Sequence, residues 1–325
     1  MRAHRIAVSV FMVAAAISTM AQQVTIQEYP LPVFSHPHDA APAADGGVWY
    51  TAQISGSLGW LDPATGKTRV VPLGLGSGPH GVIVGPDGAP WVTMEGSNDI
   101  VRVDPVTFAV KRFPLPSSAR QAELNTATFD SRGMLWFTGQ AGWYGRLDPG
   151  AGKIEAFPAP RGRGPYGMDA RGPGPVLFVS LAGDYMGIID PATARLTVVD
   201  PPVKGTGPRR VWLDSQGIAW VTGWDSGKLL RYDPGTGTWK QFVVPGARPQ
   251  PYAVYVDEQD RIWISDFGGN ALHMFEPAAK RFTTFPIPTG GAEVRQLAGR
   301  PGEVWGAESA KNRLIVIRFG PAPKP

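Results

Sequence analysis

A tryptophan recurs at a nearly constant interval along the chain of 325 residues. Six tryptophans and one leucine follow one another at steps of 42, 45, 41, 43, 43 and 42 residues: Trp49, Trp91, Trp136, Leu177, Trp220, Trp263 and Trp305. Each lies in a short β-rich segment such as VWYT, PWVT or IWIS. Seven units of one period indicate a repeat architecture, in which neighbouring units bury one another's apolar faces. We expect the recurring tryptophans to form the core between units and not to bind a ligand.

The remainder of each unit predicts further short strands. An acidic residue followed by proline ends a third strand at Asp62, Asp104, Asp148, Asp190, Asp233 and Glu276. A fourth strand ends near proline, as in RFPLP, AFPAP and TFPIP. Four short strands in about 42 residues are typical of a β-propeller blade. A helical repeat is excluded because 33 prolines and 41 glycines interrupt every run of helical length.

The two ends of the repeat region predict a closed ring. The seventh unit stops at LIVIRFG without its own fourth strand, whereas an unassigned strand, VTIQEYPLP, precedes the first unit. We therefore expect this strand to complete the seventh blade, which leaves no open sheet edge. The prediction is an all-β, seven-bladed propeller of four-stranded blades in a single domain over residues 22–320, with a C-terminal tail over 321–325.

The first 21 residues resemble a secretory signal peptide. Arg2 and Arg5 precede an apolar run that is too short to span a bilayer, and Ala21 ends a small-residue cleavage site. The expected location is periplasmic or secreted. After cleavage, 29 basic and 27 acidic residues leave a net charge of +2 without a basic stripe, so we expect no nucleic-acid partner. We also expect no membrane span and a monomer, and the absence of cysteine excludes disulfides and a thiolate nucleophile.

The stretch PHGVIVGPDGAPWVTME predicts a hairpin with polar groups at its open end. A two-residue turn at Asp87-Gly88 would place His80 opposite Glu95, close enough for a hydrogen bond or a shared ligand. The same construction in every blade gives seven pairs at one mouth of the channel: His38/Gln53, His80/Glu95, Asn125/Gln140, Tyr166/Leu181, Arg209/Trp224, Tyr252/Phe267 and Val294/Ser309.

These pairs predict a mouth with a polar half and an aromatic half. An amphipathic ligand with rings of its own would suit such a mouth. The candidate residues for contacting it are His38, His80, Asn125, Tyr166, Arg209, Trp224 and Tyr252. Glu123, two residues before Asn125, is a spare metal ligand or an ordinary charged loop residue. Asn125 and Gln140 are equally consistent with solvated amides. Arg209 and Arg210 would bind an anionic group or remain solvated at the rim.

The chain resembles the streptogramin B lyase (virginiamycin B lyase) family. The resemblance rests on elements such as PHGVIVGPDGAPWVTMEG, IVRVDPVTFAVKRFPLP and MLWFTGQAGWYGRLDPGAGKIEAFPAP and extends over nearly the whole repeat region. It implies that His80 is the proton acceptor, that His38 contacts substrate and that Glu95 helps to bind Mg²⁺. The family has another metal-binding glutamate two residues before its base, where this chain has Gly78. The resemblance therefore implies weak or absent Mg²⁺ binding, with Glu123 or Gln140 assisting Glu95.

The reaction that the resemblance implies is an elimination. A base removes the proton α to a carbonyl, the ester C–O bond at the β carbon breaks, and a cyclic depsipeptide becomes linear. Two other classes remain open from the residues alone. One is a metal-dependent hydrolase of the lactonase type, and the other is a non-enzymatic propeller that binds peptide or glycan at the aromatic half. In each case the partner is a small molecule or cyclic peptide at the channel mouth.

Overall fold

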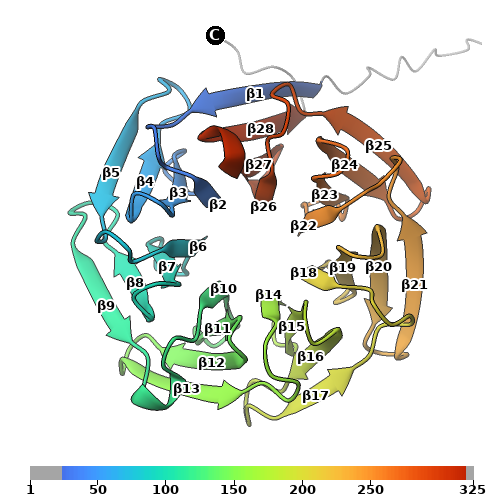
Figure 1. Cartoon of the computed structure of the whole chain (residues 1–325), viewed down its shortest axis with the longest axis horizontal. Coiled ribbons are helices and arrows are strands. Elements are labelled where there is room, and N and C mark those ends of the chain that lie inside the picture. The colour runs from blue at the N-terminus through green and yellow to red at the C-terminus, as the bar shows by residue number, and fades with distance from the viewer. Residues whose placement is uncertain (1–23, 320–325) are drawn as a thin grey trace, which may run out of the picture.

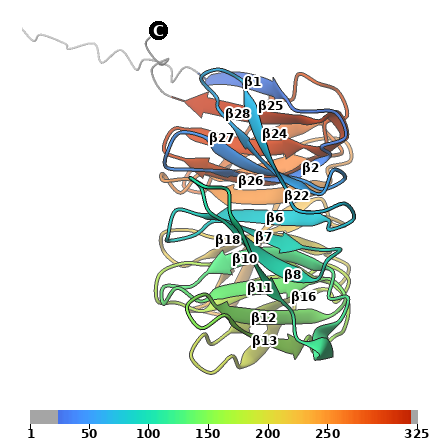
Figure 2. The ribbon, with the colours of Figure 1, turned by 90° about the vertical axis from the view of Figure 1, so that its left-hand side faces the viewer.

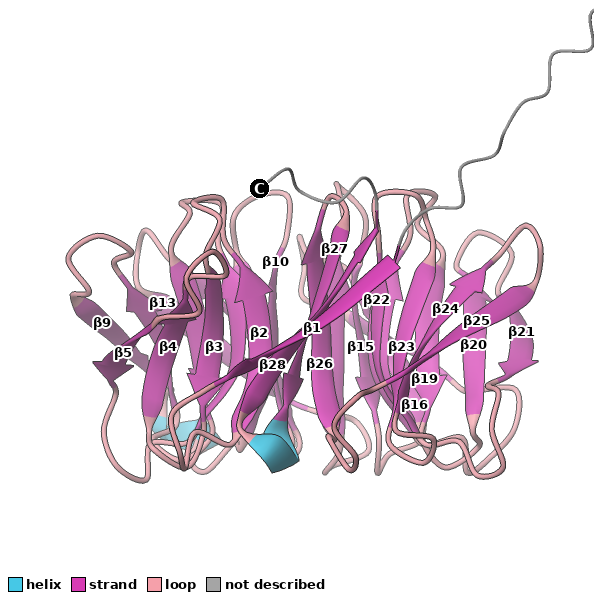
Figure 3. Cartoon of the chain, turned by 90° about the horizontal axis from the view of Figure 1, so that it is seen from above, coloured by secondary structure: helices cyan, strands magenta, loops and turns pink. Residues whose placement is uncertain are grey.

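Seven four-stranded antiparallel sheets surround a central channel in the computed structural model, which describes residues 24–319 (Figure 1). This confirms the predicted seven-bladed propeller. The expected signal peptide and the tail over 321–325 lie outside the described residues. Viewed edge-on, the strands run between two faces made of loops (Figures 2 and 3). No helix within residues 24–319 has the length and apolar character needed to cross a bilayer.

Each blade is built from the channel outward. The innermost strands are β2 (Pro37–Pro42), β6 (Pro79–Val84), β10 (Leu124–Phe129), β14 (Pro165–Ala170), β18 (Pro208–Leu213), β22 (Pro251–Val256) and β26 (Val294–Arg300). The second strands are β3 (Val48–Ala52), β7 (Pro90–Met94), β11 (Leu135–Gly139), β15 (Val176–Ser180), β19 (Ala219–Gly223), β23 (Ile262–Asp266) and β27 (Glu303–Glu308).

The outer half of each blade is more exposed. The third strands are β4 (Ser57–Leu61), β8 (Asp99–Val103), β12 (Trp143–Asp148), β16 (Tyr185–Ile189), β20 (Lys228–Asp233), β24 (Ala271–Glu276) and β28 (Arg313–Phe319). The outer strands are β5 (Thr68–Pro72), β9 (Val110–Pro114), β13 (Lys153–Pro158), β17 (Leu196–Val199), β21 (Thr238–Val243), β25 (Arg281–Pro286) and β1 (Val24–Pro30). Two short 3₁₀ helices, η1 (Ser117–Ala119) and η2 (Ser309–Lys311), mark the face where the innermost strands begin (Figure 3).

The recurring tryptophans form the core, as predicted. Trp49, Trp136, Trp220, Trp263 and Trp305 are at most 1% exposed, and Trp91 is 3% exposed. Where an indole N–H faces the hairpin turn, an aspartate accepts it: Trp136 donates to Asp130 at 2.9 Å. A buried indole therefore keeps its hydrogen bond, which is what allows so large a side chain to recur in the interior.

The N-terminal strand closes the ring, as predicted. β1 pairs antiparallel with β28 from Val24 opposite Phe319 to Pro30 opposite Arg313. Tyr29 is buried against Trp305, with ring centroids 5.5 Å apart. Glu28 accepts a hydrogen bond from Arg313 at 2.6 Å. In Figure 3 the ribbon of β1 crosses the outside of the seventh blade. The first and last blades therefore meet without an open edge between them.

A second carboxyl group lies at this closure and predicts a pH effect. Glu308 is fully buried next to Glu28, and burial together with the Glu28 charge raises its pKa from 4.5 to about 8. The folded protein therefore keeps a proton that the unfolded chain loses above about pH 4.5. We expect stability to fall as the pH rises from about 4.5 to 8, because the unfolded state binds fewer protons over that range.

Glu308→Gln tests this, because glutamine has the same shape and does not titrate. Urea unfolding of both proteins at several pH values is expected to show a variant whose stability falls less steeply than that of the wild type. The difference should be largest near pH 8. Parallel curves over that range would contradict a buried, protonated Glu308.

The predicted register of the blade hairpins is wrong by one residue. In β6 and β7, Ile83 lies opposite Trp91, whereas a two-residue turn would have placed Val84 there. The loop has three residues, Pro86 to Gly88, and is closed by a hydrogen bond from the Gly85 N–H to the Ala89 carbonyl at 2.8 Å. Gly88 has a φ of +73°, the left-handed conformation that ends three-residue hairpin loops.

A β-bulge interrupts all seven innermost strands near their first residues. In β6 the bulge lies between Pro79, opposite Met94, and Val82, opposite Val92. His80 therefore does not face Glu95. A bulge re-aims the side chains around it, and here it brings consecutive residues of each strand toward the channel.

A hydroxyl on the second strand holds most of these bulges. Thr93 accepts the Gly81 N–H at 2.9 Å and donates to the Asn125 carbonyl of the next blade. Thr51, Thr138 and Thr222 make the equivalent pair of hydrogen bonds, so one side chain fixes a bulge and joins two blades.

Thr93→Val is expected to lower the free energy of unfolding by about 1–3 kcal/mol. Valine keeps the shape but leaves a buried N–H and a buried carbonyl without their partner. Denaturant unfolding measures the loss. Thr197→Val, at an exposed position on β17, is the matched control and should change stability little. Equal effects of the two substitutions would show that the hydroxyl link contributes nothing specific.

Candidate functional site

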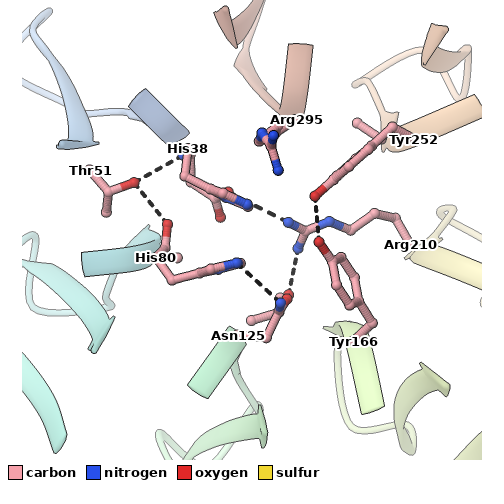
Figure 4. Close-up of polar contacts among 12 residues, drawn as sticks. His38, Thr51, His80, Asn125, Tyr166, Arg210, Tyr252 and Arg295 are labelled. Atoms are coloured by element: carbon pink, nitrogen blue, oxygen red, sulfur yellow. Dashed lines mark hydrogen bonds and ion pairs between the residues drawn. The ribbon is translucent and has the colours of Figure 1, made fainter. Parts of the chain in front are cut away.

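The bulged starts of the innermost strands converge at one end of the channel (Figure 4). The first bulge residue of each blade contributes to this cluster: His38, His80, Asn125, Tyr166, Arg209, Tyr252 and Arg295. Most of these side chains are buried, while Arg209 and Arg295 are partly exposed. Six of them were predicted as site residues. The structure brings these six together, although through the bulges and not through the predicted hairpin pairing.

Two imidazoles lie against each other in this cluster. The ring centroids of His38 and His80 are 3.6 Å apart, and the rings are tilted by 38°. Both side chains are almost fully buried. Burial lowers the pKa of each well below 6.5; for His38 the next cause is the charge of Arg210, and for His80 it is His38. Both rings are therefore neutral at pH 7, which is the state a proton acceptor requires.

Asn125 holds one nitrogen of His80. The Asn125 amide lies 3.2 Å from His80 Nε2, and Thr126 donates to the amide oxygen at 2.8 Å. A 180° rotation of the amide exchanges its donor and its acceptor, so Asn125 can support either tautomer. The other ring nitrogen, Nδ1, has no hydrogen-bond partner among residues 24–319. His80 thus has one nitrogen held and one free.

Asp39 is a site residue that the sequence reasoning missed. Its carboxylate lies 2.8 Å from His38 Nδ1 and 3.5 Å from Arg210 Nη2, and the side chain is almost fully buried. Burial raises its pKa, although the charges of Arg210 and His80 act in the opposite direction. Counting alternate residues along a regular strand points Asp39 away from His38. The bulge removes that alternation, and the only sequence signal is the direct succession of the two residues.

Two further arginines complete the cluster. Arg210 is 2% exposed and donates to Thr126, while its Nε and Nη2 have no hydrogen-bond partner among the described residues. Arg295 donates to Ser309 at 2.7 Å and pairs with Glu293 at 3.3 Å. The sequence reasoning placed Val294 at the mouth where the structure places Arg295. The sign of the local potential is therefore more positive than the predicted pairs implied.

The predicted aromatic half of the mouth surrounds Arg209. The guanidinium carbon lies 4.8, 4.5 and 3.8 Å from the ring centroids of Tyr166, Trp224 and Tyr252. Phe267 stacks on Tyr252 with centroids 4.8 Å apart. The two tyrosine hydroxyls are hydrogen-bonded to each other. Burial raises the pKa of Tyr252, but the charges of Arg209, Arg210 and Arg295 outweigh it and leave the pKa lowered.

The predicted metal ligands do not form a preorganised magnesium site. Glu95 accepts a hydrogen bond from Gln53 at 2.7 Å, and Glu123 pairs with Arg163 at 2.6 Å. Within residues 24–319 no three histidine or carboxylate side chains are grouped as metal ligands would be. Gly78 has a φ of +57°, a conformation that a glutamate adopts only with strain. Since Mg²⁺ requires several oxygen ligands in near-octahedral geometry, these residues do not fit it.

The fold and the mouth together define a closed seven-bladed propeller with a buried imidazole pair at one end of its channel. The chain belongs to the virginiamycin B lyase family, whose model matches residues 67–319. His80 lies within the matched range, whereas His38 precedes it. The search of curated proteins found no match.

Solved structures share this fold at low sequence identity. A streptogramin B lyase structure is 21% identical, with a TM-score of 0.82 over 91% of this chain and 98% of that one. Virginiamycin B lyase from Staphylococcus aureus is 19% identical, with a TM-score of 0.83 over 91% and 99%. YCF48 bound to D1 peptide is 13% identical, with a TM-score of 0.72 over 92% and 97%. The likeness therefore establishes the propeller and leaves the chemistry to the site.

Proposed function

We propose that this protein is an exported lyase that linearises a cyclic depsipeptide or a related cyclic ester by β-elimination at the mouth formed by His38 and His80. The observation that carries the proposal is the free Nδ1 of a neutral, buried His80. Membership of the virginiamycin B lyase family supports the reaction class. Export is supported by the signal-like N-terminus alone.

In the proposed reaction His80 acts as the general base through Nδ1. Asn125, with its amide oxygen toward His80, accepts the Nε2–H and leaves the Nδ1 lone pair available. The base removes the proton α to the ester carbonyl's neighbouring amide or ester group. The electron pair forms the carbon–carbon double bond as the β C–O bond breaks, and the ring opens to a carboxylate. No water enters the product, which separates this reaction from hydrolysis.

His38 and Asp39 orient and polarise the base. The carboxylate of Asp39 accepts the Nδ1–H of His38, which fixes its tautomer and leaves its Nε2 lone pair unprotonated. The His38 ring packs on His80 and restricts its rotation. As His80 gains a proton, the nearby Asp39 carboxylate stabilises the imidazolium.

Negative charge develops on the carbonyl oxygen next to the α carbon when the proton leaves. Arg210 offers two N–H groups without partners in a buried site, where such donors act strongly. A divalent metal would otherwise supply this stabilisation. Because the carboxylates present do not fit Mg²⁺, no step of the proposal depends on a metal, and turnover should persist in the presence of a chelator.

Mass spectrometry of the purified protein incubated with a streptogramin B depsipeptide tests the proposal. A linear product of unchanged mass, formed equally with Mg²⁺ and with chelator, is the expected result. A product heavier by one water would assign hydrolysis instead. No product would leave the family membership intact and reject this substrate, and loss of product with chelator would reject the metal-free mechanism.

A further inference from the structure

Arg209 is a half-buried cation without a carboxylate partner. No carboxylate oxygen lies within 4.0 Å of its guanidinium among residues 24–319. Its Nη2 donates to the Tyr166 hydroxyl at 3.2 Å, and its Nε has no partner. Three aromatic faces surround it, but rings offset only part of the cost of removing a charge from water.

The neighbouring charges do not neutralise Arg209. Asp39 is the buried carboxylate of the cluster, and it is already shared by His38 and Arg210. Glu293 pairs with Arg295, Glu95 with Gln53, and Glu123 with Arg163. With both histidines neutral, the described mouth therefore carries an uncompensated positive charge. Buried charges in proteins are normally paired, so the missing partner is expected from outside the chain.

A groove beside Trp224 extends from this cation along the same face. It has a volume of about 800 Å³ and runs between the fifth and sixth blades. Its walls include Trp224, Val243, Arg248, Pro249, Gln250 and Gly268. An apolar wall ending at an unpaired guanidinium suits a ligand that has an apolar body and one oxyanion.

We propose that Arg209, held among Tyr166, Trp224 and Tyr252, is the receptor for a carboxylate of the ligand, and that the ligand's apolar portion lies in the groove beside Trp224. The inference rests on the proposed function of the same mouth and names its substrate class as carboxylate-bearing. The carboxylate has two sources. The substrate carries it from the start, or cleavage of the ester releases it.

Two pairs of small probes test this, with binding to the full chain without its signal peptide measured by isothermal titration calorimetry. N-acetylphenylalanine and its amide differ only in an α-carboxylate of the kind that ester cleavage releases. Acetyl-Asp-Phe-amide and acetyl-Asn-Phe-amide differ only in a side-chain carboxylate. We expect the acid of at least one pair to bind about 10-fold or more tightly than its neutral partner, with the preference shrinking as salt is added.

Arg209→Gln is expected to remove the preference for the acid, and Arg209→Lys to retain part of it because the charge remains. Arg281→Gln is the matched control, since Arg281 is an exposed arginine on β25, paired with Glu276. It removes one positive charge far from the mouth and should leave the preference unchanged. Near-UV circular dichroism of each variant checks that the aromatic cluster is intact.

A preference in the first pair alone assigns the receptor to the released carboxylate, and a preference in the second pair assigns it to a carboxylate of the substrate. Equal binding of acid and amide in both pairs overturns the inference, as does no binding at millimolar concentrations or an undiminished preference in Arg209→Gln. No turnover is needed for these measurements. Acid-selective binding without ester opening would reject only the proposed reaction, and ester opening without acid selectivity would reject only the receptor.

Discussion

His80→Ala is expected to reduce turnover of a susceptible cyclic ester by about 10³-fold or more while leaving ligand binding largely intact. A general base contributes about 10²- to 10⁴-fold, and here Nδ1 of His80 is the ring nitrogen with no partner in the described cluster. The alanine variant also loses the packing of His80 on His38, so a modest loss of stability is expected as well.

Steady-state kinetics and thermal unfolding of the same preparations separate these effects. His36→Asn is the matched control, because His36 is a half-buried histidine near the same face and its positive φ of 42° is one that asparagine tolerates. Its turnover should equal that of the wild type. Turnover in His80→Ala within a few fold of the wild type would remove His80 from the mechanism.

Deletion of residues 24–30 is expected to abolish the stable monomer. The strand contributes a full ladder of pairs with β28 and buries Tyr29 against Trp305. Each lost hydrogen bond costs about 1 kcal/mol, and the buried tyrosine adds about 2–3 kcal/mol. The sum is comparable to the whole stability of about 5–15 kcal/mol that a folded domain has. The deletion also exposes β28 as an edge, which promotes association.

Urea unfolding and size-exclusion chromatography measure the outcome. A synthetic peptide with the sequence of residues 22–34 should restore the monomer when added to the deleted protein, because it re-forms the missing edge strand. A variant that lacks only residues 321–325 controls for truncation and should remain monomeric. An unchanged unfolding midpoint in the protein without residues 24–30 would show that ring closure contributes little to stability.

The tryptophan period predicted the fold because one buried residue per blade fixes the repeat length, and the missing fourth strand after LIVIRFG predicted the closure. The register was wrong because Pro86-Asp87-Gly88 forms a three-residue loop where a two-residue turn was expected. The bulges then carry two consecutive residues to the channel in each blade. A count of alternate positions therefore finds His38 and His80 and misses Asp39 and Arg210.

The expected magnesium ligands show a second limit of sequence reasoning. Glu95 and Glu123 lie near each other, since the charge of Glu123 contributes to the raised pKa of Glu95. Their hydrogen bonds to Gln53 and Arg163 are contacts between different blades, which no local pattern predicts. The same holds for the aromatic cage of Arg209, whose three rings come from three blades.

The pairing of Val24 with Phe319 has a consequence for how the chain folds. Loop-closure entropy must be overcome before two segments 295 residues apart gain from their contact. During synthesis, β1 leaves the ribosome first and then has no partner until β28 follows. The individual blades can form early because their contacts are local, but the ring cannot lock until almost the whole chain is available. Refolding should accordingly show fast acquisition of β structure followed by a slower phase in which Trp305 becomes buried against Tyr29.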